Sequence, residues 1–498
     1  MPEAKDKIKI LSDNLFPVVG IGASAGGLDA FKRLLKAIPE DSGMAYILVQ
    51  HLDPAHESIL SDLLQRVTKI PVHEITDNIK VEPDHIYIIP SNKLLTATDG
   101  ILELSFRPSN KRNMPIDVLF ISLAEVHQNH AIGVVLSGTG TDGTLGLKAI
   151  KEHGGIAFVQ QQQSASYDAM PQSAVDAGVA DFILAPEKMP AQLLALKNGL
   201  KAADDTEEGK NYLQKNEFKQ IYALLRSRKG VDFTYYKQTT IQRRISRRIV
   251  LSMKENLSDY FVHVKENSTE LDILYQDLLI PVTQFFRDPK FFEYLCESVF
   301  PALLNAKPSS EPLRIWVAGC STGEEAYSIV MCLNEYLGDK VSAQKIQVFA
   351  TDISDIAITK ARSGIYKKSE LIGVSEARLQ QFFVKTDDKF CINKSIRDCC
   401  VFAYHNYLKD PPFAKIDLIS CRNSLIYLEP FLQKNALTTF HYALNEKGFL
   451  LLGKSETTGP ASELFNIVDK TNKIYTRKGL RGKFLHVIAE RKEEIFKI

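Results

Sequence analysis

The architecture of this chain is set first by the stretch VVGIGASAGG (Val18–Gly27), a short apolar strand that runs into a glycine-rich turn. The glycines permit a tight turn into a helix, and that turn presents one serine, Ser24. Far downstream, RIWVAGCSTGEE (Arg314–Glu325) repeats the plan of an apolar strand followed by a glycine turn. Because a strand, a glycine turn and a helix in succession are typical of α/β folds, the sequence predicts two such domains.

The composition is that of a globular protein with several domains. Its 498 residues suffice for about two or three domains, each with its own core. Lysine and arginine (61) nearly balance aspartate and glutamate (60), so no excess of charge points to nucleic acid. No apolar run approaches the ~20 residues of a membrane span, and Met1–Lys9 lacks the apolar stretch of a signal peptide. We expect a cytoplasmic protein without direct membrane insertion.

The cysteines argue against a metal centre and against a disulfide framework. All 7 lie in the second half, in an odd number and without the paired spacing of metal ligands. They are Cys296, Cys320, Cys332, Cys391, Cys399, Cys400 and Cys421. We expect no bound metal.

Short β-branched runs alternate with helical patterns in the first part of the chain, which indicates a parallel sheet wrapped by helices. Helical periodicity marks Leu28–Ala37 and Thr144–His153, and Val81–Leu104 predicts a hairpin with Asp99-Gly100 as its turn. Strands are expected at Phe16–Ile21, Ala45–Gln50, His85–Ile89, Ala131–Leu136, Ile156–Gln160 and Phe182–Ala185.

A polar segment, Lys201–Lys210, is the best linker in the sequence. Beyond it, Phe218 to about Phe300 predicts helices almost throughout. Buried strands return at Ile315–Ala318, Gln347–Ala350, Leu418–Ser420 and Phe449–Leu452. We therefore assign an α/β domain to residues 14–198, a linker to 199–212, a helical module to 213–300, and a second α/β domain to 301–490 with a small β insert at about 364–402. The predicted fold class is two doubly wound parallel-sheet domains joined by a helical module.

Ser24 lies in a G-x-S-x-G turn, the pattern of a nucleophile elbow. A serine nucleophile needs a base and an acid that orients the base. His51 directly follows one predicted strand, and Asp142 follows another after a glycine-rich turn. Because the carboxyl ends of parallel strands converge, these three residues can meet. A packing turn, a phosphate-binding turn or a dinucleotide loop remain alternatives, although a dinucleotide loop requires an acid where this chain has His51.

The second glycine turn contains Gly319 and Gly323, and the strand after the following helix ends in Asp352. Glycines permit close approach of a cofactor, and an acid at that strand end binds ribose hydroxyls. The pattern suits an adenosyl cofactor and also fits other nucleotide-binding α/β folds.

The first part of the chain resembles the catalytic domain of the chemotaxis protein-glutamate methylesterases, the CheB family. The resemblance implies Ser24 as nucleophile, His51 as base and Asp142 as the acid that orients it, in the hydrolysis of glutamyl methyl esters on receptors. It also implies glutamine deamidation as a second reaction. Ala25 and Thr139 depart from the pattern, since stand-alone members often have threonine and methionine there. The motifs that carry the resemblance are Ile21–Gly27, Gln50-His51 and Leu136–Gly143.

The second part, roughly residues 213 to 480, resembles the chemotaxis receptor methyltransferases, the CheR family. Its motifs are Pro281–Asp288, Arg314–Glu325, Ala361–Tyr366, His405–Leu408 and Ile419–Tyr427. The resemblance implies S-adenosyl-L-methionine as cofactor, with Arg287 and Tyr427 near the reacting methyl group. Pro281 departs from the pattern, where a stand-alone member has asparagine. The residues implied around the cofactor are Thr283, Arg287, Glu325, Asp352, Asn406, Tyr407, Cys421 and Arg422.

Physical chemistry gives some of these residues a second interpretation. Phe285 and Phe286 are expected in the core and not at the cofactor, and Cys421 is expected as a small buried residue whose family contact is made by its backbone. Arg287, beside two buried aromatic residues, suits a bidentate clamp on a carboxylate.

Thr239–Ile249 predicts a basic helix with four arginines: Arg243, Arg244, Arg247 and Arg248. A solvated face is the default interpretation, and nucleic acid is a weak rival because the net charge is small. In the resembling family this helix contacts the acidic methylation region of receptor helices, and we favour such a partner. Phe382–Val401 predicts short strands around an Asp387-Asp388 turn. They correspond to the family's small β-subdomain, which in some members docks a receptor's C-terminal peptide.

The sequence as a whole predicts a fusion of a receptor glutamyl methylesterase with a receptor glutamate O-methyltransferase. A signalling scaffold that has lost one or both activities is the alternative, and a modifier of a sensor protein other than a chemoreceptor is a third. The expected partners are cytoplasmic helices of methyl-accepting receptors or sensor proteins. The residues before Phe16 leave no room for a phosphoacceptor domain. We therefore expect regulation by geometry, either through the Lys201–Lys210 linker or through a segment beyond the amphipathic C-terminal stretch.

Overall fold

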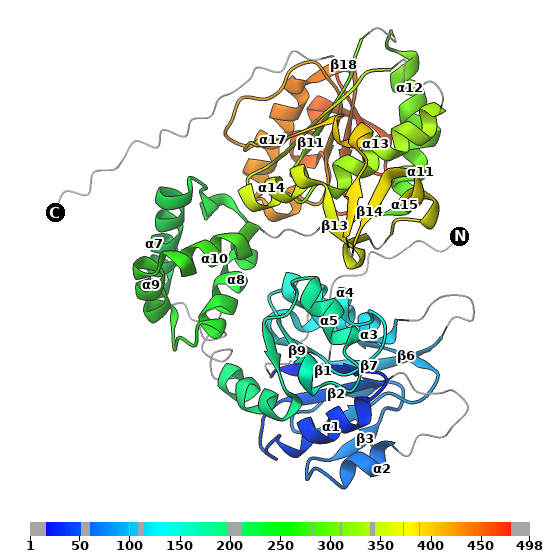
Figure 1. Cartoon of the computed structure of the whole chain (residues 1–498). Coiled ribbons are helices and arrows are strands. Elements are labelled where there is room, and N and C mark those ends of the chain that lie inside the picture. The colour runs from blue at the N-terminus through cyan, green and yellow to red at the C-terminus, as the bar shows by residue number, and fades with distance from the viewer. Residues whose placement is uncertain are drawn as a thin grey trace, which may run out of the picture. The chain divides into compact units, whose positions relative to one another are not determined.

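The computed structural model describes ten segments of the chain, in which two compact units form (Figure 1). One unit combines the first α/β domain with most of the helical module, up to Ile280; the other contains residues 235–238 and everything from Pro281 onward. The expected linker, residues 199–212, lies almost wholly outside the described residues, which are 16–50, 60–98, 100–107, 114–197, 212–279, 283–308, 311–338, 344–371, 373–387 and 389–479, without the side chains of 212–215.

The first unit is built on a seven-stranded sheet in the order β10-β9-β8-β1-β2-β5-β3, in which every neighbouring pair is parallel. The six expected strands are confirmed to within two residues at each end, and β3 is an additional short edge strand. The bounds are β1 Val18–Ala23, β2 Ala45–Gln50, β3 Val72–Glu74, β5 Ile86–Ile88, β8 Ala131–Val135, β9 Ile156–Gln160 and β10 Phe182–Leu184.

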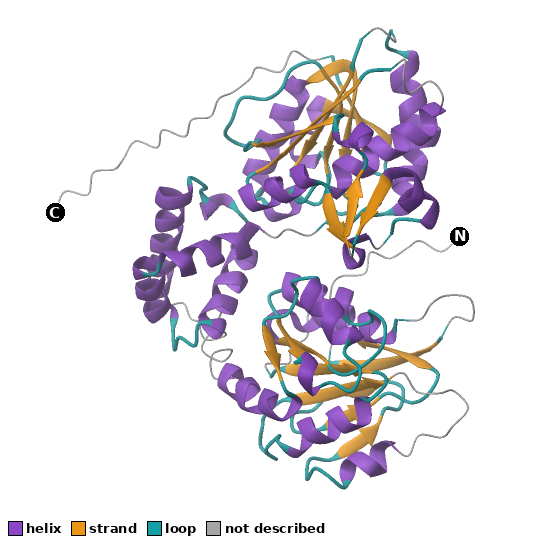
Figure 2. Cartoon of the chain, in the orientation of Figure 1, coloured by secondary structure: helices purple, strands orange, loops and turns teal. Residues whose placement is uncertain are grey.

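Helices cover both faces of this sheet (Figure 2). Successive strand residues such as Tyr46 and Ile47 are both buried but belong to different core clusters, because side chains alternate between the faces. One face is covered by α1 Gly27–Lys36 and α2 Leu60–Gln65, the other by α3 Pro115–His127, α4 Thr144–Glu152 and α5 Ala169–Asp176. The expected hairpin is confirmed as β6 Lys93–Thr98 paired with β7 Ile101–Phe106, with β4 Ile79–Lys80 beside β7.

The strand order places a topological switch point at β1. The chain continues from β1 to β2 on one side, and only later adds β8 on the other side. In open parallel sheets the crevice for a ligand opens at the carboxyl ends of the strands at such a point. The turns after β1 and β8 therefore flank the expected site.

The helical module contains α7 Tyr212–Lys229, α8 Gln238–Leu251, α9 Leu257–Glu266 and α10 Ser268–Leu279. Helix α8 packs against the first α/β domain, and Val250 joins that domain's core. Arg244 donates to the carbonyl oxygen of Glu152 (2.6 Å), and Arg247 donates to that of Gly155 (3.1 Å). Since Gly155 directly precedes β9, α8 lies at the amino-terminal edge of the sheet, opposite the turns after β1 and β8.

The expectation of a solvated arginine face is wrong for three of the four arginines. Arg247, whose side chain is 2% exposed, forms ion pairs with Asp181 and with Asp277 (2.8 Å). Arg248 makes a bidentate pair with Glu270 (2.9 and 2.7 Å). Together with Arg244, these side chains are used within the chain, because a guanidinium buried on packing requires acceptors.

The second unit is built on a sheet in the order β16-β12-β11-β17-β18-β20-β19. The pairs from β16 to β18 are parallel, and β20 and β19 are added antiparallel. The expected strands are confirmed, with bounds β11 Leu313–Ala318, β12 Ile346–Asp352, β16 Cys400–Tyr404, β17 Ile416–Cys421, β18 Leu444–Leu452, β19 Phe465–Asp469 and β20 Ile474–Arg477.

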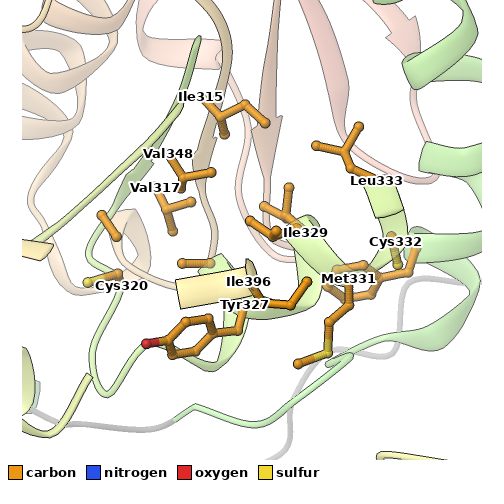
Figure 3. Packing of buried hydrophobic residues seen from close by; sticks show 14 of the residues in the cluster. Ile315, Val317, Cys320, Tyr327, Ile329, Met331, Cys332, Leu333, Val348 and Ile396 are labelled. Carbon is orange, nitrogen blue, oxygen red and sulfur yellow. The ribbon is translucent and has the colours of Figure 1, made fainter. Parts of the chain in front are cut away.

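Helix α13 is the central helix of this unit's larger core (Figure 3). Ile329 from α13 meets Ile315 and Val317 of β11 and Val348 of β12 in that core. Phe285 and Phe286 are buried in it, as expected. The helices are α11 Pro289–Tyr294, a π-helical turn Leu295–Val299, α12 Phe300–Asn305, α13 Glu324–Leu337, α14 Asp355–Ser363, α15 Glu376–Phe382, α16 Lys394–Arg397 and α17 Pro430–Ala443.

The β insert is confirmed but is smaller than expected. It is an antiparallel sheet in the order β13-β15-β14; of the predicted Asp387-Asp388 turn, Asp388 lies outside the described residues. The expected end at about residue 402 is wrong, because Cys400 already begins β16, which pairs in parallel with β12 in the large sheet. The strands are β13 Ile365–Lys367, β14 Phe383–Thr386 and β15 Lys389–Ile392. Across the described residues, helices of sufficient length and apolarity to span a membrane are absent.

Replacing Arg247 by methionine should selectively destabilise the first unit. The substitution leaves Asp181 and Asp277 without their shared cation, so we expect the unit's free energy of unfolding to fall by about 3–5 kcal/mol. Urea unfolding of the whole chain would be followed by circular dichroism and by fluorescence of the single tryptophan, Trp316, which lies in the second unit. The fluorescence midpoint should stay unchanged. The exposed Arg228→Met is the control, and an equal loss in both variants would contradict the role of the ion pairs.

Candidate active sites

Ser24 lies on the turn directly after β1. Its N–H donates to the carbonyl oxygen of Ser137 (2.9 Å), and its own carbonyl oxygen accepts from the N–H of Gly27 (2.9 Å). Gly26 has a φ of 74°, and a Cβ there would lie 2.7 Å from the Ser137 hydroxyl. The turn therefore requires glycine at this position, as the sequence pattern predicted.

A hydrogen-bond network around Ser137 fixes this turn. The Ser137 hydroxyl donates to the carbonyl oxygen of Ala25 (2.8 Å) and accepts from the N–H of Tyr167 (3.0 Å). The Ser137 N–H donates to the buried side chain of Gln160 (2.8 Å). The sequence analysis quoted Ser137 only as part of a motif and missed Gln160, although Gln160 is a polar residue at the end of an apolar strand.

Asp142 is buried on the loop between β8 and α4. Its Oδ2 accepts from the N–H of Ile116 (3.1 Å), and its Oδ1 accepts from those of Asp117 (2.9 Å) and Gly143 (2.9 Å). Three backbone donors fix the orientation of this carboxylate. Asp142 is thus a buried, oriented acid at the amino end of α3.

The structure brings two of the three expected esterase residues to one edge of the sheet. Ser24 follows β1 and Asp142 follows its neighbour β8, which pairs with β1 up to Gly22 and Val135. His51 lies outside the described residues, so its place in a triad stays a prediction.

Asp117 is a residue of this site that the sequence analysis missed. It is 4% exposed on α3, and its Oδ1 accepts from the N–H of Gly146 (2.7 Å). Among the described residues its Oδ2 has no hydrogen-bond partner. Burial, and then the neighbouring Asp142 charge, raise the pKa of Asp117 to about 7. An acid in the first turn of a helix usually interacts with the helix dipole, so the position of Asp117 in the sequence does not indicate that it is buried.

In the second unit, the loop after β11 folds back on β12. The N–H groups of Gly319 and Cys320 both donate to the carbonyl oxygen of Thr351 (2.8 and 2.9 Å). Gly323 has a φ of 98°, and a Cβ there would lie 3.0 Å from Ala361. The loop ends at α13, whose amino end faces any ligand of the turn.

Asp352 ends β12 at this loop. Its Oδ2 accepts from the N–H of Ser321 (2.9 Å), and its Oδ1 accepts from that of Ser354 (2.9 Å). Burial raises the pKa of this carboxyl, while the two amides oppose the shift. The Ser321 hydroxyl is buried without a partner among the described residues. A glycine loop, an oriented carboxylate and an unsatisfied hydroxyl fit an adenosyl cofactor.

Arg422 ties three segments around this loop together. Its Nη1 donates to Glu325 on α13 (3.1 Å) and its Nη2 to Asp288 (2.8 Å) and to the carbonyl oxygen of Arg287 (3.1 Å). Its guanidinium also lies 3.9 Å from the ring centre of Phe291. With a side chain 1% exposed, Arg422 is a buried structural tie that holds the backbone of Arg287 in place.

The other expected residues of this site lie on loops at the same edge of the sheet. Tyr407 shares a hydrogen bond with Ser424 (2.8 Å), and the Asn406 side chain accepts from the N–H of Leu408 (3.0 Å). Cys421 is fully buried at the end of β17, as expected, and burial raises the pKa of its thiol well above the usual value. Thr283, Arg287 and Tyr427 are half-buried on loops or in a short 3-10 turn.

Two features that position Tyr427 were missed from the sequence. Glu456, 4% exposed, accepts from the N–H groups of Gly453 (2.6 Å), Asn423 (2.9 Å), Leu425 (2.7 Å) and Ile426 (3.3 Å). The Glu456 side chain therefore holds the loop before Tyr427 by binding the backbone N–H groups of that loop.

A segment of the helical region pairs with the same loop. The N–H of Lys237 donates to the carbonyl oxygen of Tyr427 (2.9 Å), and the N–H of Glu429 donates to that of Tyr235 (3.1 Å). The position of Glu456 shortly after the buried strand β18 could have indicated its role. The backbone pairs of Lys237 and Glu429 could not have been predicted, because backbone hydrogen bonds between distant segments leave no pattern in the sequence.

Asp117→Asn should stabilise the first unit more at high pH than at low pH. The folded pKa of about 7 lies above the ordinary pKa of an aspartate, so stability falls as pH rises between these values and the full penalty applies above pH 7. Asparagine removes the charge but keeps an acceptor for Gly146. We expect a gain on the order of 1–3 kcal/mol at pH 8 and almost none at pH 4, measured by thermal unfolding. The exposed Asp62→Asn is the control, and a gain independent of pH would contradict a buried titrating carboxyl.

Comparison with known families assigns the two candidate active sites to two different families. The model of the CheB methylesterase family matches residues 19–193. The CheR methyltransferase all-alpha domain matches 216–279, and the CheR methyltransferase SAM binding domain matches 281–474. The cofactor assigned to the second α/β domain is therefore S-adenosylmethionine.

Several relatives cover one or both parts. A chemotaxis protein methyltransferase of Borreliella burgdorferi is 30% identical over 268 residues, which are 52% of this chain and 95% of the relative. A Leptospira interrogans protein named protein-glutamate methylesterase/protein-glutamine glutaminase is 33% identical over 183 residues, 36% of this chain and 95% of the relative. A 104.1 kDa protein of Rhodobacter capsulatus is 34% identical over 437 residues, 84% of this chain, which spans only 46% of that relative.

Among solved structures, the CheB methylesterase catalytic domain of Thermotoga maritima is 29% identical and matches with a TM-score of 0.34, covering 36% of this chain and 98% of its own. The two well-covered relatives identify the two parts separately. The chain belongs to the CheB protein-glutamate methylesterase family in its first part and to the CheR chemotaxis methyltransferase family in its second, and so unites two enzyme families of opposite chemistry.

Proposed function

We propose that this protein both hydrolyses glutamyl methyl esters and methylates glutamate carboxylates on the cytoplasmic helices of signalling receptors. One observation carries the proposal: each of its two sheets has a glycine turn at the carboxyl ends of its parallel strands and an oriented carboxylate at the same edge, the buried Asp142 in one and the half-buried Asp352 in the other. Each arrangement meets the requirement of one of the two reactions.

In the esterase half, Ser24 attacks the ester carbonyl while His51 accepts its proton and passes it to the departing methanol. Water then hydrolyses the glutamyl ester of Ser24 by the reverse proton transfers. Three backbone N–H groups hold the Asp142 carboxylate in a fixed orientation, so it can orient the protonated base. The same acyl chemistry would deamidate glutamine, an activity included in the name of the Leptospira relative.

In the methyltransferase half, Asp352 and the Gly319–Gly323 loop would hold S-adenosylmethionine. When bound, the cofactor supplies a methyl group on a sulfonium centre. A glutamate carboxylate is already ionised at neutral pH and needs no general base, so positioning and exclusion of water carry the rate. Arg287, held through its backbone by Arg422, would orient that carboxylate, with Tyr427 close to the methyl group.

The proposed partner is a methyl-accepting receptor or a related sensor protein. The names of the relatives support a chemotaxis-type substrate for both halves. Arg244, Arg247 and Arg248 bind within the chain, so recognition of an acidic receptor helix would rest on surfaces outside this cluster.

Ser24→Ala should abolish the release of methanol from methyl-esterified receptor, by about 10³-fold or more, because the nucleophile is lost. His51→Ala should lose nearly as much, since the residues of a triad act as a unit. Calorimetry should give the same affinity for S-adenosylmethionine as in the parent chain. Ser105→Ala, at an exposed serine, is the matched control. Methanol release that survives in Ser24→Ala would refute the nucleophile.

Asp352→Ala should weaken the binding of S-adenosylmethionine by about 1–3 kcal/mol, because charged hydrogen bonds to ribose hydroxyls are lost. Isothermal titration calorimetry on the whole chain measures the change. Asp355→Ala removes an exposed acid three residues away and should leave the affinity unchanged. Equal affinities in the parent and Asp352→Ala would place the cofactor elsewhere.

A further inference from the structure

A pocket of about 330 Å³ opens in the second unit beside the π-helical turn Leu295–Val299. None of the residues that line it is assigned above to the cofactor or to methyl transfer. It is lined by Phe286, Pro289, Phe292, Glu293, Cys296, Glu297, Gly373 and Arg378.

Two cysteines meet at the wall of this pocket. Cys296, on the π-helical turn, is half-buried and faces the pocket, whereas Cys332, on α13, is fully buried behind it. The turn packs against α13, and the two thiols are in hydrogen-bonding contact. A π-helical turn inserts one residue into a helix and is frequent at functional sites. Here the π-helical turn presents the Cys296 sulfur to the pocket, and the Cys332 sulfur of α13 lies behind it.

The surroundings make the two thiols unequal. The hydrogen bond from Cys332, and the nearby Arg378 cation, lower the pKa of the Cys296 thiol, against opposing contributions from burial and from Glu335 and Glu297. The same contact and burial raise the pKa of Cys332. Arg378 is fixed by two hydrogen bonds to Glu335 (2.7 and 2.8 Å) and by stacking 3.8 Å over the Phe286 ring. Since the thiolate is the nucleophile, the accessible cysteine is also the reactive one.

We propose that Cys296 is a peroxide-reactive thiol and that Cys332 is its resolving partner. The Cys296 thiolate attacks one oxygen of a small hydroperoxide, the O–O bond breaks, and a sulfenic acid forms as hydroxide leaves. The Cys332 thiol then attacks the Cys296 sulfur, an S–S bond forms, and the displaced oxygen departs as water. Two thiols and one hydrogen peroxide thus give one disulfide and two waters, and the peroxide is reduced. The site does not depend on the proposed methyl-transfer function.

Exposure of the whole reduced chain to substoichiometric hydrogen peroxide, followed by intact-mass and non-reducing peptide analysis, tests the proposal. We expect the loss of two hydrogens per chain, a cross-linked peptide pair that contains Cys296 and Cys332, and full reversal by a dithiol reductant. Cys332→Ser keeps a hydrogen-bond donor beside Cys296 but cannot form a disulfide, so it should stop the reaction at the sulfenic acid, which dimedone would trap on Cys296. Cys296→Ser should show neither product.

Cys399→Ser is the matched control, because Cys399 is also half-buried but burial raises the pKa of its thiol. This variant should form the disulfide as fast as the parent chain. Oxidation of Cys399 at a rate equal to that of Cys296, or a disulfide that joins other cysteines, would overturn the proposal. So would an absence of dimedone adduct in Cys332→Ser, a readout that does not require the disulfide geometry.

Discussion

Hydrogen bonds from backbone amide groups to buried or half-buried carboxylates are the interaction on which both halves of this protein depend. Asp142 accepts three such hydrogen bonds, Asp352 two and Glu456 four. Asp352 is the last residue of a strand, whereas Asp142 and Glu456 lie on loops that follow strands. The loops beside Asp142, Asp352 and Tyr427 are therefore held by charge-assisted bonds to the main chain, whereas the Ser24 turn is held by the hydrogen bonds around Ser137.

The same requirement explains the raised pKa values near the sites. A carboxyl group removed from water is costly in its charged form unless donors replace the lost hydration. Asp352 has such donors on both oxygens, and they oppose the rise in its pKa that burial causes. Asp117 has a donor on Oδ1, while its Oδ2 has no hydrogen-bond partner among the described residues, and burial raises its pKa to about 7.

Arginine has the complementary role: as a buried cation it donates hydrogen bonds that connect segments distant in the sequence. Arg247 joins α8 and α10 to the amino edge of the first sheet, through Asp181 and Asp277. Arg422 joins α13 to the segment that precedes α11. Helix α8 lies at the edge of the sheet opposite the turns after β1 and β8. The expected regulation through the Lys201–Lys210 linker concerns residues outside the described part of the chain.

The sequence by itself determined the two parallel sheets, because buried β-branched strands and glycine turns leave a local pattern, as in Val18–Gly27 and Arg314–Glu325. It also predicted Ser24, Asp142 and Asp352 at the carboxyl ends of strands, because each of them follows an apolar run closely in the sequence. Only the tertiary structure decided which charges are buried: the arginines of α8 look like a solvated face until the partners from Asp181 and Glu152 are present. The same is true of Asp117, Glu456 and the pair Cys296 and Cys332. Such contacts join residues far apart in the chain, and helical or strand periodicity contains no information about them.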